Sequence, residues 1–125
     1  MDIIMNSCGV AEWRYAVEIL SYPFEEVHDI VAEYGLSICL DIGHVMRIGG
    51  DPTDLFDTYR ERISVIHLHG YVGEKDHLPL DVLRDEELSV VFDICGRFSG
   101  AVCLEVFSLK YLQRSLQCME RIVRE

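Results

Sequence analysis

The sequence predicts an α/β protein made of four βα units, which amounts to half of a (βα)8 barrel. A short β-branched stretch, a polar turn and a segment with helical apolar spacing follow one another four times. Each expected strand is apolar on one side and small or polar on the other. An open sheet covered by helices on both faces would instead be apolar on both, whereas a barrel has a narrow, partly polar interior.

In the first unit we expect a strand over 14–20, on which Val17 and Glu18 point to opposite sides, and a helix over 24–34. Gly35 is well placed to end that helix.

The second unit is expected to have a strand over 36–41. Its helix begins at Asp51, an N-cap residue followed by Pro52, and its apolar stripe extends to Ile63.

The third and fourth units complete the pattern. Their strands are expected over 65–69 and 101–107, and their helices over 85–97 and 109–123. No linker or low-complexity stretch divides the four units, so the 125 residues are expected to form one partial-barrel domain, 1–125. Four strands cannot close such a barrel, so the other half would be an absent N-terminal segment or a second copy, or there is no other half at all.

Composition restricts the possible partners. The formal net charge of −11 repels nucleic-acid backbones, and the sequence contains no basic patch, so we expect a small-molecule substrate. No apolar run approaches the roughly 20 residues of a membrane helix, and the first residues do not resemble a secretory signal. These features predict a cytoplasmic protein that binds neither membrane nor nucleic acid.

The five cysteines are odd in number and irregularly spaced, without a CxxC motif. They therefore indicate reduced thiols and not a disulfide framework or a zinc ribbon. Cys39 and Cys103 lie in apolar runs, where a free cysteine usually serves as a small core residue.

Polar residues gather at the expected strand ends, and four of the five histidines are among them. Carboxylates and imidazoles that converge from successive strands suit a divalent cation in an open site, with zinc or manganese favoured. A cation would also offset the cost of pointing several ionisable groups into one barrel mouth. The set comprises Glu18, Asp41, His44, His67, His69, Asp76, His77 and Glu105.

These residues also allow simpler interpretations. An acid at a strand end, such as Glu18 or Glu105 taken alone, is often a helix cap or a surface charge, and His67 could be a hydrogen-bonded core histidine. The sequence Asp41-Ile-Gly-His44 points more firmly to ligands, because its glycine allows a sharp turn after the strand that aims both side chains at one point.

The order of these motifs resembles the xylose isomerase-like TIM barrels, which include sugar-phosphate isomerases, epimerases and apurinic-site endonucleases. The resemblance covers nearly the whole chain and implies that it is the C-terminal half of the barrel, strands five to eight. It implies metal ligands at five positions and a catalytic loop histidine at His77. The ligand positions are Glu18, Asp41, His44, His67 and Glu105.

Two departures from the family pattern accompany this resemblance. The histidine ligands of the family's first half-barrel are absent, and Lys75 occupies the usual position of the loop acid, which leaves Asp76 or Glu74 as substitutes. Within the superfamily, Leu-Glu-Val-Phe-Ser at 104–108 and His-Leu-His-Gly at 67–70 look most like the cobamide-remodelling hydrolases.

That branch implies hydrolysis of a phosphodiester in the cobamide nucleotide loop. The metal would polarise a phosphoryl oxygen and activate water, with His69 or Asp76 as an outer-sphere partner or proton shuttle.

Two other readings stay open. For a sugar isomerase or epimerase, Glu18 and Glu105 would act as acid and base. Alternatively, the chain is an inactive or truncated half barrel whose role is assembly. In every case the exposed strand edges predict a homo-oligomer or pairing with a missing N-terminal half.

Overall fold

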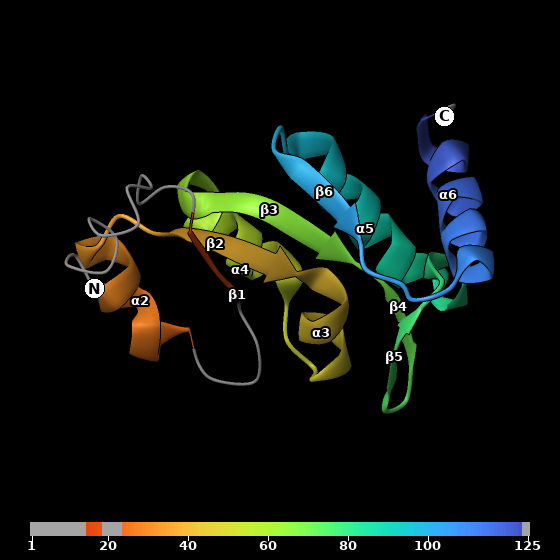
Figure 1. Cartoon of the computed structure of the whole chain (residues 1–125), viewed down its shortest axis with the longest axis horizontal. Helices are drawn as coiled ribbons and strands as arrows, with labels where there is room; N and C mark the ends of the chain where they lie inside the picture. The colour runs from red at the N-terminus through yellow and green to blue at the C-terminus, as the bar shows by residue number, and fades with distance from the viewer. Residues whose placement is uncertain (1–14, 19–23, 124–125) are drawn as a thin grey trace.

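The computed structural model describes residues 15–18 and 24–123, and its centre is a four-stranded sheet. All three strand pairs are parallel, in the order β1-β2-β3-β6 (Figure 1). Four parallel strands in chain order confirm the predicted half-barrel arrangement. The strands are β1 (Ala16–Glu18), β2 (Ser37–Asp41), β3 (Ile63–Leu68) and β6 (Ala101–Leu104).

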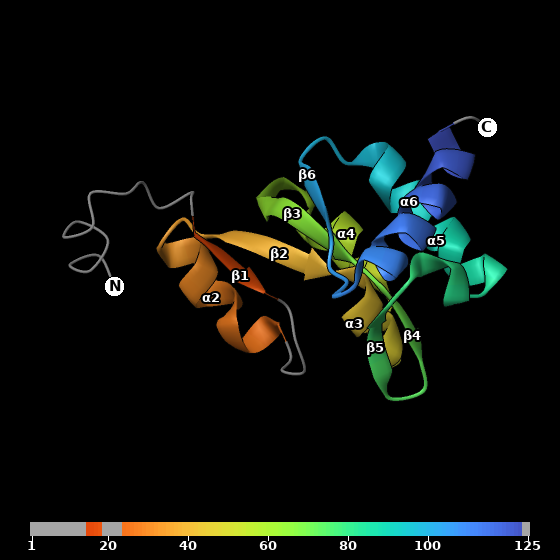
Figure 2. The same ribbon diagram turned by 45° about the vertical axis from the view of Figure 1, so that its right-hand side comes forward.

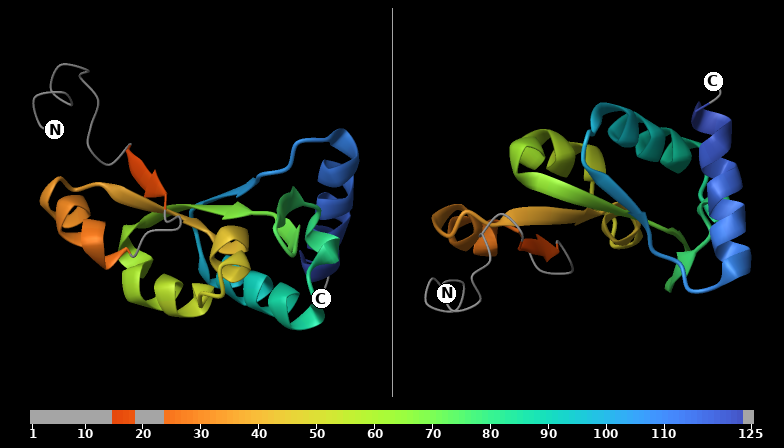
Figure 3. Two further views of the ribbon diagram at one scale, coloured as in Figure 1. Left: turned by 90° about the horizontal axis from the view of Figure 1, so that it is seen from below. Right: turned by 45° about the horizontal axis from the view of Figure 1, so that its top comes forward.

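A helix follows each strand, as predicted. Figure 3 shows α4 and α5 side by side against one face of the sheet, while α6 lies beyond β6 at the opposite end from α2. The expected bounds of α5 and α6 are confirmed to the residue. The four helices are α2 (Glu25–Glu33), α4 (Pro52–Tyr59), α5 (Asp85–Arg97) and α6 (Leu109–Val123).

The strand bounds differ at several ends. Positions 14, 19 and 20 of the first expected strand lie outside the described residues. The fourth strand ends at Leu104 and not at 107. Ile63 was expected on the apolar stripe of the second helix, which is wrong: α4 ends earlier, a 3-10 turn η2 (Arg60–Arg62) follows, and Ile63 begins β3.

Three short elements were not expected, and all of them lie near the carboxyl ends of the strands. Helix α3 (Ile42–Arg47) directly follows β2, the antiparallel hairpin of β4 (Gly70–Val72) and β5 (Lys75–Leu78) follows β3, and the 3-10 turn η3 (Leu80–Val82) leads to α5. Figure 2 shows the hairpin extending away from the main sheet beside α3.

The core lies between the sheet and the helices on its outer face. Ile38, Leu40, Ile66 and Phe56 are all 0 % exposed, as alternation along β2 and β3 against α4 predicts. Within the described residues, no helix is long and apolar enough to span a membrane.

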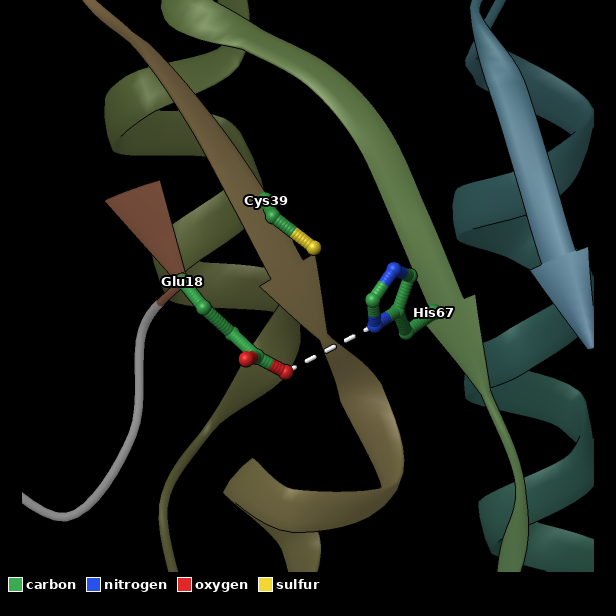
Figure 4. A group of neighbouring side chains, drawn as sticks. All are labelled: Glu18, Cys39 and His67. Carbon is green, nitrogen blue, oxygen red and sulfur yellow. Dashed lines mark ion pairs between the residues drawn. The ribbon is translucent and has the colours of Figure 1, made fainter. Parts of the chain in front are cut away.

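The inner face of the sheet differs from the outer one. The inner face carries Glu18, Cys39 and His67 (Figure 4). On the edge strand β6, Ala101 and Cys103 are exposed to solvent. The expectation that Cys103 is a core residue is therefore wrong, because β6 is an edge strand with no further described strand beside it. Cys39 is buried, at 4 % exposure. Both edges of the sheet, β1 and β6, lack a neighbouring strand among the described residues.

Candidate metal centre

Four of the predicted ligands converge at the carboxyl ends of the strands. Glu18 ends β1, Asp41 ends β2 directly opposite His67 of β3, and Glu105 follows β6. Each offers one ligand atom, and these four atoms lie within 4.8 Å of one another. Parallel strands bring residues at equivalent ends to one edge, so the convergence follows from the register of the sheet.

The centre of this four-residue cluster is His67. Its Nδ1 lies 2.9 Å from Oε2 of Glu105 and 3.5 Å from Oε1 of Glu18. The Nδ1 of His67 and the Oε2 of Glu105 are nevertheless buried without a hydrogen-bond partner among the described atoms. Buried polar atoms normally find partners, so two such atoms facing one point fit a bound cation with nitrogen and oxygen ligands.

Asp41 combines two roles. It is 3 % exposed, and its Oδ1 accepts a hydrogen bond from the backbone amide of His44 at 2.9 Å, which caps α3. The same oxygen lies 3.0 Å from Nε2 of His69. Burial would raise the pKa of Asp41, but the hydrogen bonds from His69 and from the His44 amide outweigh it and lower the pKa below its ordinary value. The carboxylate therefore stays ionised and available as a ligand.

His69 lies behind Asp41 and outside the four-residue cluster. It is 2 % exposed, and its Nδ1 is 3.1 Å from the carbonyl oxygen of Gly70 and 3.2 Å from the backbone nitrogen of His77. Burial would lower the pKa of His69, but the hydrogen bond and charge of Asp41 raise it above the ordinary value. This arrangement corresponds to an outer-sphere partner that orients a ligand carboxylate.

Gly43 makes the contact between α3 and His69 possible. A Cβ atom at this position would lie 2.6 Å from Cε1 and 2.7 Å from the carbonyl oxygen of His69. The chain does turn sharply after the strand, since β2 ends at Asp41 and α3 begins at Ile42, and Gly43 lies within this helix without a positive φ angle. The lack of a side chain at Gly43 allows α3 to approach His69 closely.

The hairpin brings Asp76 and His77 to the same edge. Nδ1 of His77 is 2.7 Å from Oδ1 of Asp76, and its Nε2 is 3.5 Å from Oε1 of Glu105. The hydrogen bond from His77 lowers the pKa of Asp76. His77 has a φ angle of 56°, a strained backbone conformation for a residue other than glycine. Strain of this kind is concentrated at functional sites.

His44 is not part of the four-residue cluster. Its Nδ1 lies 3.3 Å from a guanidinium nitrogen of Arg47, and its Nε2 is buried without a hydrogen-bond partner among the described atoms. Arg47, which the sequence did not single out, also lies 3.8 Å from Asp76. The proposed ligand role of His44 stays a prediction.

The structure adds two residues that sequence reasoning did not place at the site. Phe107 is 77 % exposed and stacks on His77 with ring centroids 4.6 Å apart. Cys39 forms a second group of possible ligands with Glu18 and His67 (Figure 4), and its side chain points toward the His67 ring. Burial, together with the charges of nearby carboxylates, raises the pKa of the Cys39 thiol to about 12. Cys39 could have been identified from the sequence, because it lies two residues before Asp41 and therefore on the same face of the strand.

Fold and site together define a half TIM barrel with a candidate metal centre at the carboxyl ends of its strands. Comparison with solved structures supports this fold class. The chain is similar to 3-keto-D-glucoside 4-epimerase YcjR from E. coli in its apo form, with a TM-score of 0.65 and 12 % identity. It is also similar to the IOLI protein with a bound zinc atom, with a TM-score of 0.61 and 20 % identity.

These similarities extend over the whole chain but only part of each neighbour. The alignments cover 99 % and 98 % of this chain, against 49 % of YcjR and 52 % of IOLI. The chain therefore spans about half the length of the structures it matches. No protein-family model and no curated protein sequence matches it.

Proposed function

We propose that this chain carries half of the active site of a metal-dependent enzyme of the xylose isomerase-like class that isomerises or epimerises a keto-sugar or sugar phosphate. The convergence of Glu18, Asp41, His67 and Glu105 on one point carries the proposal. The similarity to an epimerase of a 3-keto-glucoside and to a zinc-binding protein of the same fold supports it.

The two glutamates are well placed for proton transfer. Glu18 and Glu105 belong to opposite edges of the sheet and flank His67 on either side. One carboxylate would remove a proton from the carbon next to the substrate carbonyl, and the other would return a proton to the same or the neighbouring carbon. A bound divalent cation supplies Lewis-acid polarisation of the carbonyl.

His77 and Asp76 connect Glu105 with the exterior. His77 lies between the two carboxylates, with its Nδ1 toward Asp76 and its Nε2 toward Glu105. An imidazole between two carboxylates can take a proton from one side and release it on the other, so this pair would reset Glu105 after each turnover.

The substrate would also need a surface opposite the inner face of the sheet. We propose that a complementary half barrel supplies it, either as a longer polypeptide or as a second copy of this chain, because β6 has no further strand beside it among the described residues. Hydrolysis of a cobamide phosphodiester has no support from the two structural neighbours, and the isomerase alternative is closer to them.

Isothermal titration with Mn²⁺ or Zn²⁺, followed by a deuterium-exchange assay, tests the proposal. We expect saturable binding of one of these ions and metal-dependent exchange of the hydrogen next to the carbonyl of a keto-sugar phosphate in deuterated water. Absence of metal binding would rule the proposal out. Release of a nucleoside from a cobamide without such exchange would favour the hydrolase reading instead.

A further inference from the structure

Cys39 is buried on the inner face of the sheet. Its side chain is 4 % exposed, yet it is absent from the cluster of apolar side chains that contains its neighbours Ile38 and Leu40. Successive side chains of a strand alternate between faces, so Cys39 points to the inner face, together with Glu18 and His67 (Figure 4). On that face the sulfur of Cys39 lies close to the ligand candidates Glu18 and His67.

The thiol has the geometry of a ligand. One atom each of Glu18, Cys39 and His67 lies within 4.8 Å of the other two. Donor atoms around a tetrahedral zinc ion are spaced by about 3.3 to 3.8 Å when the bonds measure about 2.0 to 2.3 Å. A small change in side-chain torsions is therefore enough to bring the three donors to one ion, with water or a carboxylate in the fourth position.

We propose that Glu18, Cys39 and His67 form a second donor set, with a soft sulfur ligand, that takes a thiophilic divalent cation such as Zn²⁺. The inference rests on the proposed function, because this set shares Glu18 and His67 with the four-residue cluster. Cys39 lies two residues before Asp41, about 6 to 7 Å further inside the half barrel.

The two sets differ in the ions they prefer. Oxygen ligands from Asp41 and Glu105 suit a hard ion such as Mn²⁺, whereas a thiolate favours zinc or cadmium. When the cation binds to sulfur it replaces the thiol proton, which passes to the solvent. A single ion therefore occupies the outer or the inner position according to its softness.

Cadmium is a suitable probe, since a cadmium–thiolate bond gives a charge-transfer absorption in the ultraviolet. We expect this band on titration of the wild-type chain with Cd²⁺, and its loss in Cys39→Ser. The Cys103→Ser variant is the matched control. Cys103 is paired with His67 on the neighbouring strand β6, and it is exposed. It should keep the band.

Binding affinities separate the two donor sets. Removal of an outer-sphere partner already weakens metal binding by about 10- to 100-fold, so loss of the sulfur ligand should weaken Zn²⁺ binding by at least about tenfold. Binding of Mn²⁺ to Cys39→Ser should stay within about twofold of wild type, because the oxygen ligands are unchanged.

X-ray absorption of the zinc-loaded wild-type chain gives a measurement that needs no variant. A sulfur shell at about 2.3 Å supports the proposal. A zinc ion with nitrogen and oxygen ligands alone, or a cadmium band that persists in Cys39→Ser, overturns it. Tight Mn²⁺ binding without a sulfur shell would leave the proposed function intact, whereas failure of both ions to bind would overturn both.

Discussion

At the scale of single residues, Glu105 connects the two parts of the candidate site. It lies 2.9 Å from His67 through one oxygen and 3.5 Å from His77 through the other. The carboxylate is therefore shared between the ligand cluster and the hairpin. Its charge, and not only its hydrogen-bonding capacity, matters in both roles.

Glu105→Gln should weaken Mn²⁺ binding by at least about tenfold, because an amide oxygen is neutral and a poorer ligand than a carboxylate. Isothermal titration measures the change. Glu86→Gln, an exposed change in the first turn of α5, is the control and should leave binding unaltered. Equal affinities in both variants would count against Glu105 as a ligand.

One methyl group added at Gly43 should have a large effect on the stability of the protein. Gly43→Ala should lower the free energy of unfolding by about 1 to 3 kcal/mol, since its Cβ would overlap the His69 ring and backbone. Denaturant unfolding monitored by circular dichroism checks this. Gly96→Ala in α5 is the control: a Cβ there meets nothing within 4 Å. It should stabilise the helix by roughly 0.5 to 1 kcal/mol. Destabilisation by both variants would exclude the close contact as the cause.

The Asp41–His69 pair predicts how stability depends on pH in the metal-free protein. The raised pKa of His69 means that its contribution is complete below the ordinary value of 6.5 and is lost as pH rises through the folded-state pKa. The lowered pKa of Asp41 has the opposite effect. The stability that Asp41 contributes is lost as the pH falls below 3.8, the ordinary pKa of an aspartate.

Unfolding free energies should therefore decrease as pH rises above about 6.5, and this decrease should be smaller in His69→Gln. Titration with urea at several pH values measures both slopes. His28→Gln, a change on α2 away from the site, should keep the wild-type slope. The same slope in His69→Gln and wild type would show that the ion pair does not contribute.

At the scale of elements, Glu87 joins the start of α5 to the hairpin. Its Oε1 accepts a hydrogen bond from the backbone amide of Arg84 at 3.1 Å, and its Oε2 accepts one from the hydroxyl of Tyr71 in β4. Burial would raise the pKa of Glu87, but these bonds lower it. The side chain thus both caps a helix and fixes the base of the hairpin that carries His77.

Glu87→Ala should lower the free energy of unfolding by about 1 to 2 kcal/mol, because a cap and a partly buried hydrogen bond are lost together. Thermal or urea denaturation measures it. Glu86→Ala, an exposed change in the same helical turn, should cost well under 1 kcal/mol. A difference of less than a few tenths of a kcal/mol between the two variants would contradict this role of Glu87.

Sequence reasoning found the elements that have a strong apolar period and missed those that lack one. The stripes of α5 and α6 gave both helices exactly as the structure has them. Helix α3 has six residues, too few for a period, and depends on the Asp41 cap. The hairpin consists of strands of three and four residues paired only with each other, too short for a clear alternation. The positive φ of His77 leaves no trace in its residue type.

The candidate site could likewise be predicted only in part from the sequence. Alternation along the strands placed Glu18, Asp41 and His67 on one face, and their convergence follows from parallel pairing. Contacts across elements were not predictable, because the position of His69 behind Asp41 depends on the space left by Gly43. The expected burial of Cys39 is confirmed, and its strand face already indicated that it lies on the same side as His67.

At the scale of the whole molecule, the β6 edge, which has no neighbouring strand in the part of the chain that the structure describes, predicts self-association. Residues of β6 are exposed on both faces, with Val102 at 39 % exposure, and β1 is the opposite edge. Pairing with another half barrel would give the β6 edge a neighbouring strand, which it lacks among the described residues.

Light scattering of the purified chain should give at least twice the mass of a single chain, in a concentration-dependent manner. Ala101→Lys adds a charge to the exposed inner side of the β6 edge and should shift the equilibrium toward monomer. Ser99→Lys, an exposed change just before the strand, should not. A monomeric wild-type chain at all concentrations would contradict pairing through these edges.

All four cluster donors lie at the carboxyl ends of these four strands, and under the proposed function this has a consequence for how such an enzyme could diversify. The half described here would hold the ion and move the proton, whereas the opposite wall would set the shape of the cavity. Substitution or exchange of the complementary half could then change which sugar is accepted while Glu18, Asp41, His67 and Glu105 stay as they are. Reaction chemistry and substrate choice would be inherited as separable modules.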